Sequence, residues 1–180
     1  MNKPSKVITH TAASSTTATQ FDCDVWHKER WPGFTSKVFV NPKTGIGWHV
    51  GYHIWINWDG SWVQTRAFYE EGAHCLGQNT SSIGVCFAGN GDIHEPSDAQ
   101  VKAWREEVWP QIHNAFPAIK TNNIYPHRKY ANKTCHGSLL SDTYYADVLH
   151  TDSDNRAKLQ AQLIQLLNRL YVILSGERMK

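Results

Sequence analysis

The chain has 180 residues, 41% of them hydrophobic, which is enough for one domain with a substantial core. Its 18 Lys and Arg residues nearly balance its 16 Asp and Glu residues, and the formal net charge of +2 comes without a block of basic residues. This balance gives no indication of nucleic-acid binding, and no apolar run approaches the ~20 residues of a membrane span.

The N-terminus and the cysteines indicate a cytosolic product. Positive charge within Met1–Lys6 is not followed by an apolar segment, so we expect no signal peptide and synthesis in the cytoplasm. The cysteines have no regular spacing and are expected to be thiols or metal ligands instead of disulfides. They are Cys23, Cys75, Cys86 and Cys135.

The first predicted elements are a strand and a helix. The apolar run Val7–Thr9 predicts a buried strand that ends at His10, and the small polar residues 11–19 predict a loop. Phe21–Arg30 mixes apolar and charged residues as a helix does, and Trp31-Pro32-Gly33 should end it.

Short strands and turns are predicted next. Ser36–Val40 is expected to be a strand and Asn41–Gly45 a turn. Trp48–Trp58 predicts a long strand, which an Asp59-Gly60 hairpin turn joins to a strand over Ser61–Gln64.

The second half alternates strands and helices. Ser82–Ala88 predicts a strand buried on both faces, and Ser97–Gln100 is a capping box that opens a helix. Pro110 should kink or break this helix. Asn122–His127 predicts a further strand, and Asp154–Leu174 has leucines at helical spacing. We therefore expect a single α/β domain over residues 1–180, with a mixed central β-sheet flanked by α-helices.

The loop after the Asn122–His127 strand carries residues suited to a metal. His127 and Cys135 lie in it, and imidazole and thiolate are the side chains that bind zinc most readily. A catalytic zinc takes three protein ligands and leaves one position open. His10 is the preferred third ligand, because the end of a strand fixes the backbone and the following loop leaves the side chain accessible.

Spacing alone leaves rival ligand sets open. His49 and His53 would lie roughly 13 Å apart in a strand, too far for one zinc. His74 and Cys75 are adjacent and would point to opposite faces of an extended chain. His136 directly follows Cys135, which makes it a sterically awkward partner.

Four motifs occur in order between Val7 and Leu140. They are Val7-Ile-Thr-His-Thr-Ala12, Gly51-Tyr-His53 with Asp59-Gly60, Gly72-Ala-His74 with Ser82-Ile-Gly84, and His127 with Lys133-Thr-Cys135. Each is weakly specific alone. Together they resemble the type 2 N-acetylmuramoyl-L-alanine amidases, a zinc family that includes short phage lysozymes and peptidoglycan recognition proteins.

The resemblance implies a role for particular residues. It makes His10, His127 and Cys135 the ligands of one Zn2+, Tyr52 and Lys133 catalytic residues, and His74 and Asn79 substrate-binding residues. Two departures stand beside it. His136 occupies a position that is usually Pro, which should leave the loop less rigid, and Phe34–Trp48 is an expected inserted hairpin.

The resemblance also implies an activity. A hydroxide on the metal, formed because zinc lowers the pKa of bound water to ~7, would attack the amide between N-acetylmuramic acid and L-alanine in peptidoglycan. Lys133 would stabilise the developing charge, and Tyr52 would orient or deprotonate the water. The expected protein is a monomeric, bacteriolytic phage endolysin without a separate wall-binding domain. It would be made in the cytoplasm, would act on the wall in the periplasm after release, and would neither insert into membranes nor bind nucleic acid.

Other functions remain open at this point. The same domain could be a bacterial cytosolic amidase of wall recycling, or a peptidoglycan-binding module without catalysis, in which the cysteine position is commonly lost. A third hypothesis is a cysteine hydrolase with Cys135 as nucleophile and His127 or His136 as base.

Overall fold

The computed structural model describes residues 2–150 and 163–167. The chain divides into two compact units, Met1–Ala146 and Asp147–Lys180. In the second unit, residues 163–167 are helical, in agreement with the prediction for Asp154–Leu174, and the rest of that prediction lies outside the described residues. None of the described helices combines the length and the apolar character needed to cross a bilayer.

The first unit is built on one five-stranded sheet with the order β3-β2-β4-β1-β5. The strands are β1 (Lys6–Thr11), β2 (Ile54–Ile56), β3 (Trp62–Gln64), β4 (Ser82–Phe87) and β5 (Ile124–Pro126). β1 lies between β4 and β5 and is parallel to both, β2 is parallel to β4, and β3 is antiparallel to β2. The mixed sheet and the β2–β3 hairpin predicted from the sequence are confirmed.

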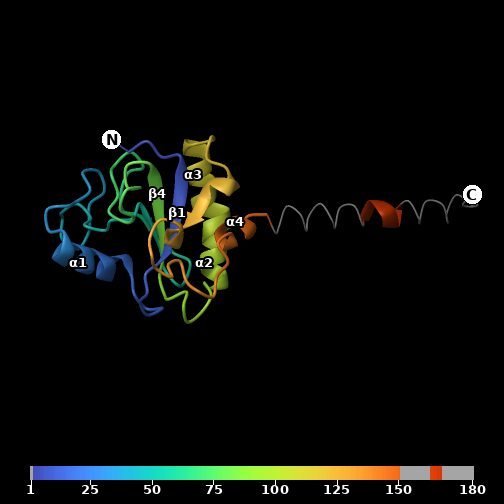
Figure 1. Cartoon of the computed structure of the whole chain (residues 1–180), viewed down its shortest axis with the longest axis horizontal. Helices are drawn as coiled ribbons and strands as arrows, with labels where there is room; N and C mark the ends of the chain where they lie inside the picture. The colour runs from blue at the N-terminus through green and yellow to red at the C-terminus, as the bar shows by residue number, and fades with distance from the viewer. Residues whose placement is uncertain (1, 151–162, 168–180) are drawn as a thin grey trace, which may run out of the picture. The chain divides into compact units, whose positions relative to one another are not determined.

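Helices cover both faces of this sheet (Figure 1). α1 (Gln20–Arg30) lies on one side, and α2 (Asp98–Ala103) and α3 (Trp109–Ala115) lie on the other. A parallel strand between two helical layers must be apolar or small on both of its faces. β4 meets this requirement, since all of its residues are buried, as predicted for Ser82–Ala88.

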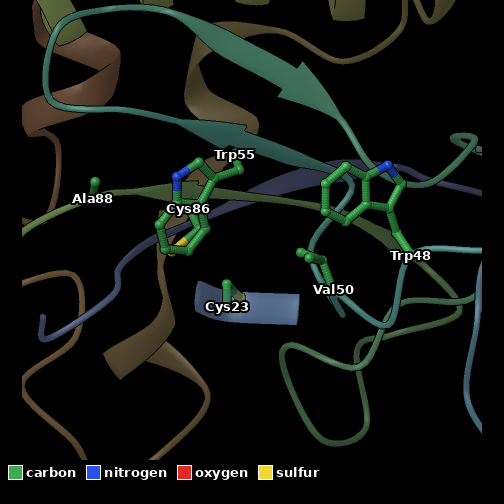
Figure 2. Close-up of a cluster of buried hydrophobic side chains, with 6 residues drawn as sticks. All are labelled: Cys23, Trp48, Val50, Trp55, Cys86 and Ala88. Atoms are coloured by element: carbon green, nitrogen blue, oxygen red, sulfur yellow. The ribbon is translucent and has the colours of Figure 1, made fainter. Parts of the chain in front are cut away.

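A core of six residues fills the space between α1 and the sheet. Figure 2 shows its members, which come from α1, β2, β4 and the segments before β2 and after β4: Cys23, Trp48, Val50, Trp55, Cys86 and Ala88. The ring of Tyr52 packs against this cluster. Because Cys86 is the register partner of His10, the cluster lies directly beside the end of β1.

A second apolar layer lies on the other face. Phe87 stacks on Tyr145 with ring centroids 4.2 Å apart, and the indole nitrogen of Trp104 donates to the Tyr145 carbonyl oxygen at 2.8 Å. Tyr145 belongs to the short helix α4 (Tyr144–Asp147). The Ser97–Gln100 capping box that opens α2 is present as predicted.

Pro110 does not end the helix that follows this capping box. α2 passes into a π-helical turn, η1 (Trp104–Val108), and α3 continues from Trp109 with Pro110 in its first turn. Pro110 has no amide hydrogen to donate, and the Trp109 amide before it donates to the Trp104 carbonyl oxygen five residues back, as in a π-helix. The predicted interruption therefore takes the form of wider hydrogen bonding before the proline, not a break at it.

The segment before β2 is less regular than predicted. Ser36–Val40 is not a strand, because the Ser36 hydroxyl accepts hydrogen bonds from the Val38 and Phe39 amides and turns the chain. The Phe34–Trp48 segment, which we expected to be an inserted hairpin, has one antiparallel bridge, between Val40 and Gly47, and the predicted turn over 41–45.

The predicted long strand over Trp48–Trp58 is also wrong, since only Ile54–Ile56 within it pairs in the sheet. The His53 amide still donates to the Gly84 carbonyl oxygen of β4, but two backbone groups further back bond to side chains. Arg66 Nε donates to the Val50 carbonyl oxygen at 2.8 Å, and the Gly51 amide donates to His27 Nδ1 at 2.8 Å. Single-sequence patterns do not reveal such side-chain partners. At the other edge, 3-10 turns η2 (Thr121–Asn123) and η3 (His127–Lys129) shorten the predicted Asn122–His127 strand to β5.

A buried carboxylate on α1 holds the chain between Asn41 and His49. Asp24 is 4% exposed; its Oδ2 accepts from the Asn41 side-chain amide at 2.8 Å, and its Oδ1 accepts from the His49 backbone amide. Both donors are themselves buried. The carboxylate therefore satisfies two donors that water cannot reach.

Replacement of Asp24 by Ala should destabilise the first unit. It leaves two buried donors without acceptors, which costs about 1–3 kcal/mol for each such group. The free energy of unfolding from urea denaturation should fall accordingly, whereas Glu29→Ala, at an exposed position of the same helix, should change it little. An equal effect of the two substitutions would contradict this role for Asp24.

Candidate metal centre

Three side chains predicted to bind metal come together at the carboxyl ends of the parallel strands β1 and β5. His10 lies near the end of β1, His127 directly follows β5, and Cys135 lies in the loop after η3. One nitrogen or sulfur atom of each residue lies within 4.8 Å of the corresponding atoms of the other two. β1 and β5 are parallel neighbours, so their carboxyl ends deliver the two histidines to the same edge.

The spacing of these atoms fits zinc. A tetrahedral ion with bonds of ~2.0–2.3 Å places its ligand atoms roughly 3.3–3.8 Å apart. The Cys135 sulfur lies 3.7 Å from Nδ1 of His10, and the His10 and His127 ring centroids are 4.6 Å apart. Two imidazoles and a thiol are also a ligand set that zinc accepts in proteins.

Arg128 holds the loop that carries Cys135. The Arg128 amide donates to the Cys135 carbonyl oxygen at 2.6 Å. The guanidinium donates to three further backbone carbonyl oxygens of the loop, those of Thr134, Gly137 and Leu140. Its Nε also donates to Asp142 Oδ1 at 2.6 Å. One residue adjacent to a candidate ligand thus fixes the loop that contains another.

A second tether comes from the segment after β4. Asp92 accepts hydrogen bonds from the Thr134 hydroxyl at 2.7 Å and the Ser138 amide at 2.6 Å. Gly91 and Gly137 pack so closely that a Cβ on either would overlap the other backbone. Sequence reasoning missed Arg128 and Asp92, because no spacing pattern identifies residues that act on backbone groups.

His136 does not leave the loop loosely held. It is 1% exposed, Nε2 lies 3.0 Å from the Ser141 carbonyl oxygen, and Nδ1 lies 2.7 Å from the Thr9 hydroxyl. Burial lowers the pKa of His136 to about 4, so the ring is neutral at pH 7. A neutral ring donates from Nε2 to Ser141 and accepts at Nδ1 from Thr9. The loop is anchored here without a proline.

Burial controls the charge of the three candidate ligands. It lowers the pKa of His10 well below its usual value and also lowers that of His127, with Lys133 contributing to both. Neutral imidazole is the form that binds metal. Burial raises the pKa of the Cys135 thiol to about 11, whereas cysteine nucleophiles have lowered values. This disfavours the cysteine-hydrolase hypothesis.

The two predicted catalytic residues differ in their surroundings. The Tyr52 ring packs against His10, with centroids 5.0 Å apart. Burial raises the pKa of the Tyr52 phenol well above its usual value, helped by the nearby Cys86, Cys23 and Cys135 thiols. Lys133 is exposed on the loop and is close enough to His10 and His127 for its charge to lower their pKa values.

His74 contacts the candidate ligand His10, and Asn79 contacts the backbone of His74. His74 is 8% exposed, and its Nδ1 lies 3.1 Å from Nε2 of His10. Asn79 Oδ1 accepts from the backbone amides of His74 and Cys75 at 3.0 and 2.8 Å. Their assignment to substrate binding stays a prediction; in this structure Asn79 bonds to its own loop, and His74 contacts His10 and the strand β4.

An open hollow lies beside the continuation of β1. It has a volume of about 390 Å³ and is lined by Ala12, Ala13, Ser14, Ser15, Ala18 and Trp26. Trp26 belongs to α1 and is 43% exposed. The preceding residue of the chain, Thr11, contacts the Cys135 sulfur through its carbonyl oxygen at 3.7 Å. Thr11 thus links the lining of this hollow to Cys135 along the chain, and none of the three candidate ligands lines the hollow itself.

Solved structures similar to this chain include N-acetylmuramoyl-L-alanine amidases, an endolysin and peptidoglycan recognition proteins. The amidase LysC from Clostridium intestinale has a TM-score of 0.64 at 19% identity, over 85% of this chain and 87% of that chain. The Ph2119 endolysin from a Thermus scotoductus bacteriophage has a TM-score of 0.62 at 17% identity, over 83% and 86%. At these identities the likeness establishes the fold.

Sequence comparison establishes the family. Residues 1–138 match the family described as N-acetylmuramoyl-L-alanine amidase, and the chain belongs to this family. Peptidoglycan-recognition protein SC2 of Drosophila melanogaster is 28% identical over 94 residues, 52% of this chain. The chain spans about half of the length of that relative, 50%.

Metal content provides a direct test of the ligand set. Purified protein should contain about one zinc per chain, as three ligands at one site require. His10→Ala, His127→Ala and Cys135→Ala should each lose it by elemental analysis. The matched controls His113→Ala and Cys75→Ala should keep it, because neither residue belongs to the cluster. Stoichiometric, tight zinc in Cys135→Ala would show that the ligand set is wrong.

Proposed function

We propose that the chain is a zinc-dependent N-acetylmuramoyl-L-alanine amidase that hydrolyses the amide between the lactyl group of N-acetylmuramic acid and L-alanine in peptidoglycan. The observation that carries the proposal is the convergence of His10, His127 and Cys135, with ligand atoms within 4.8 Å of one another. An exposed lysine, Lys133, lies close to the two histidines. Membership of the family supplies the reaction class and the substrate.

Zinc and Lys133 would each stabilise negative charge during the reaction, in different ways. When bound, zinc would supply a Lewis acid and a water of lowered pKa. Lys133 would place an ammonium group next to the carbonyl oxygen that becomes negative during attack. Its exposure suits this role, because the side chain can reach a polymer that arrives from solvent.

Tyr52 is better suited to donate a hydrogen bond than to accept a proton. Burial raises its pKa well above the usual value of a phenol, so the hydroxyl stays protonated at neutral pH. A protonated hydroxyl can orient a water or an oxyanion but cannot act as a general base in that state. Of the two predicted roles for Tyr52, we propose orientation.

The biological setting we propose is a phage endolysin that acts on the bacterial cell wall, with amidase chemistry as its lytic activity. The similarity to the Ph2119 endolysin supports this setting. A peptidoglycan-binding module without catalysis is the second candidate, because the curated relatives include peptidoglycan-recognition proteins. The intact His, His and Cys set favours the enzyme.

Product analysis separates these candidates. Digestion of purified peptidoglycan should release new L-alanine amino termini and no new reducing sugar ends. A chelator such as 1,10-phenanthroline should abolish the release and added zinc should restore it, whereas a cysteine hydrolase would keep its activity. Binding of peptidoglycan with no release of either kind would support the binding module, and new reducing ends would indicate a glycosidase.

Substitution of the two catalytic residues should lower turnover without loss of metal. Lys133→Ala and Tyr52→Phe leave every proposed ligand in place, so zinc content and Tm should stay near the wild-type values. If both residues act in the transition state, kcat should fall by ~10²-fold or more with little change in KM. Lys133→Arg keeps the charge but moves its donors and should recover only part of the rate. Full activity in Lys133→Ala would remove this residue from the mechanism.

A further inference from the structure

His74 makes a specific hydrogen bond to a candidate metal ligand. Nδ1 of His10 lies 3.7 Å from the Cys135 sulfur and so faces the site, while Nε2 of the same ring lies 3.1 Å from Nδ1 of His74. The two rings are nearly perpendicular, at 87°. The His10 ring is thus placed between the metal site and one partner.

This arrangement determines where the protons lie. A histidine that binds metal through Nδ1 carries its proton on Nε2 and must donate it. Nδ1 of His74 can accept only if that ring is neutral with its own proton on Nε2. Its Nε2 lies 3.5 Å from the Ser82 hydroxyl oxygen, which is placed to accept that proton. The Ser82 hydroxyl donates onward to the Gln78 carbonyl oxygen at 2.7 Å, which leaves its lone pairs free to accept.

The backbone around His74 is shaped to hold this ring. A Cβ at Gly84 would lie 2.5 Å from Cγ of His74, and a Cβ at Gly72 would lie 2.5 Å from its Cδ2. Gly84 is in the middle of the buried strand β4, where glycine weakens a strand and commonly marks a close approach of other atoms. Asn79 Oδ1 accepts hydrogen bonds from the backbone amides of His74 itself and of Cys75. The two glycines give the His74 ring the space it occupies, and the Asn79 hydrogen bonds hold the backbone that carries it.

We infer that His74 is a positioning residue for the metal site: its Nδ1 accepts the proton of His10 Nε2 and thereby fixes the tautomer and ring orientation in which His10 presents Nδ1 to zinc. The inference rests on the proposed zinc function and deepens it. It assigns His74 to the protein's own metal site, through a contact that exists without substrate. Loss of such an outer partner typically weakens metal binding by 10–100-fold.

The first experiment measures zinc affinity in the absence of substrate. The zinc Kd of the wild type and of His74→Leu, His74→Gln and His113→Leu would be determined by competition with a chromophoric chelator, with circular dichroism as the check of folding. His74→Leu removes the acceptor and should raise Kd by ~10–100-fold. His74→Gln retains an acceptor oxygen and should recover part of the affinity. His113→Leu changes a histidine of α3, outside the candidate cluster, and should match the wild type.

Kinetics then separate positioning from substrate contact. With zinc at saturation, a positioning role predicts little change of KM in His74→Leu. A rise in KM with an unchanged zinc Kd would instead assign His74 to substrate and overturn the inference. An unchanged Kd in folded His74→Leu would overturn it as well. Absence of zinc binding by the wild type would overturn the proposed function together with the inference, so the two failures are distinguishable.

A second measurement needs no variant and covers the case in which His74→Leu does not fold. Long-range 1H–15N NMR correlations of the zinc-loaded wild type report the protonated nitrogen of each histidine ring. His10 and His74 should both carry their proton on Nε2, with Nδ1 of His74 unprotonated. A proton on Nδ1 of His74, or zinc on Nε2 of His10, would contradict the proposed hydrogen bond.

Discussion

The candidate site depends on the parallel pairing of β1 with its two neighbours. Pairing with β5 brings the ends of the two strands to one edge, so that His10 and His127 approach each other although they are far apart in sequence. Pairing with β4 places Cys86 and Gly84 beside His10 and Ile8. One side of β1 therefore supplies a second ligand, and the other supplies the space in which His74 lies. A slip of register would disturb both at once, because it moves side chains to the opposite face.

The environment of the site is a group of buried, neutral imidazoles with no carboxylate among the described residues of the candidate cluster. Desolvation is the largest cause of the lowered pKa values of His10, His74 and His127. A protonated imidazole in such a place would have no counter-ion, so the protein favours the uncharged form that can act as a ligand or acceptor. The same burial raises the pKa of the Cys135 thiol, which metal binding would have to offset by holding the thiolate.

Sequence patterns predicted the parts of the fold that depend on local periodicity and chain punctuation. β1, α1, β4 and the capping box of α2 agree with the predictions, because apolar runs and polar caps reflect burial directly. The strands expected over Ser36–Val40 and Trp48–Trp58 were wrong or too long. In the first segment the Phe39 amide bonds to the nearby Ser36 hydroxyl, which no periodic pattern indicates. In the second, the Val50 carbonyl and the Gly51 amide bond to the side chains of Arg66 and His27, which lie in other parts of the chain.

The candidate ligands were predicted from motif order and residue type, and the structure brings them together. Their supports were not predictable in this way. Arg128 and Asp92 act on backbone groups or a single hydroxyl, and the seat of His74 consists of absent side chains at Gly72 and Gly84. Such features leave no spacing to detect. They become visible only when segments distant in sequence are placed against one another.

The hydrogen bonds of Arg128 have a consequence for how this site can change. Its guanidinium holds the Cys135 loop by the carbonyl oxygens of Thr134, Gly137 and Leu140, which every residue type possesses. Side chains of the loop that point to solvent, such as those of Asn132 and Ser138, are therefore free to vary while the path of the backbone is kept. The charge and shape of the exposed face of this loop can therefore change, by selection or by design, while the backbone that carries Cys135 keeps its place.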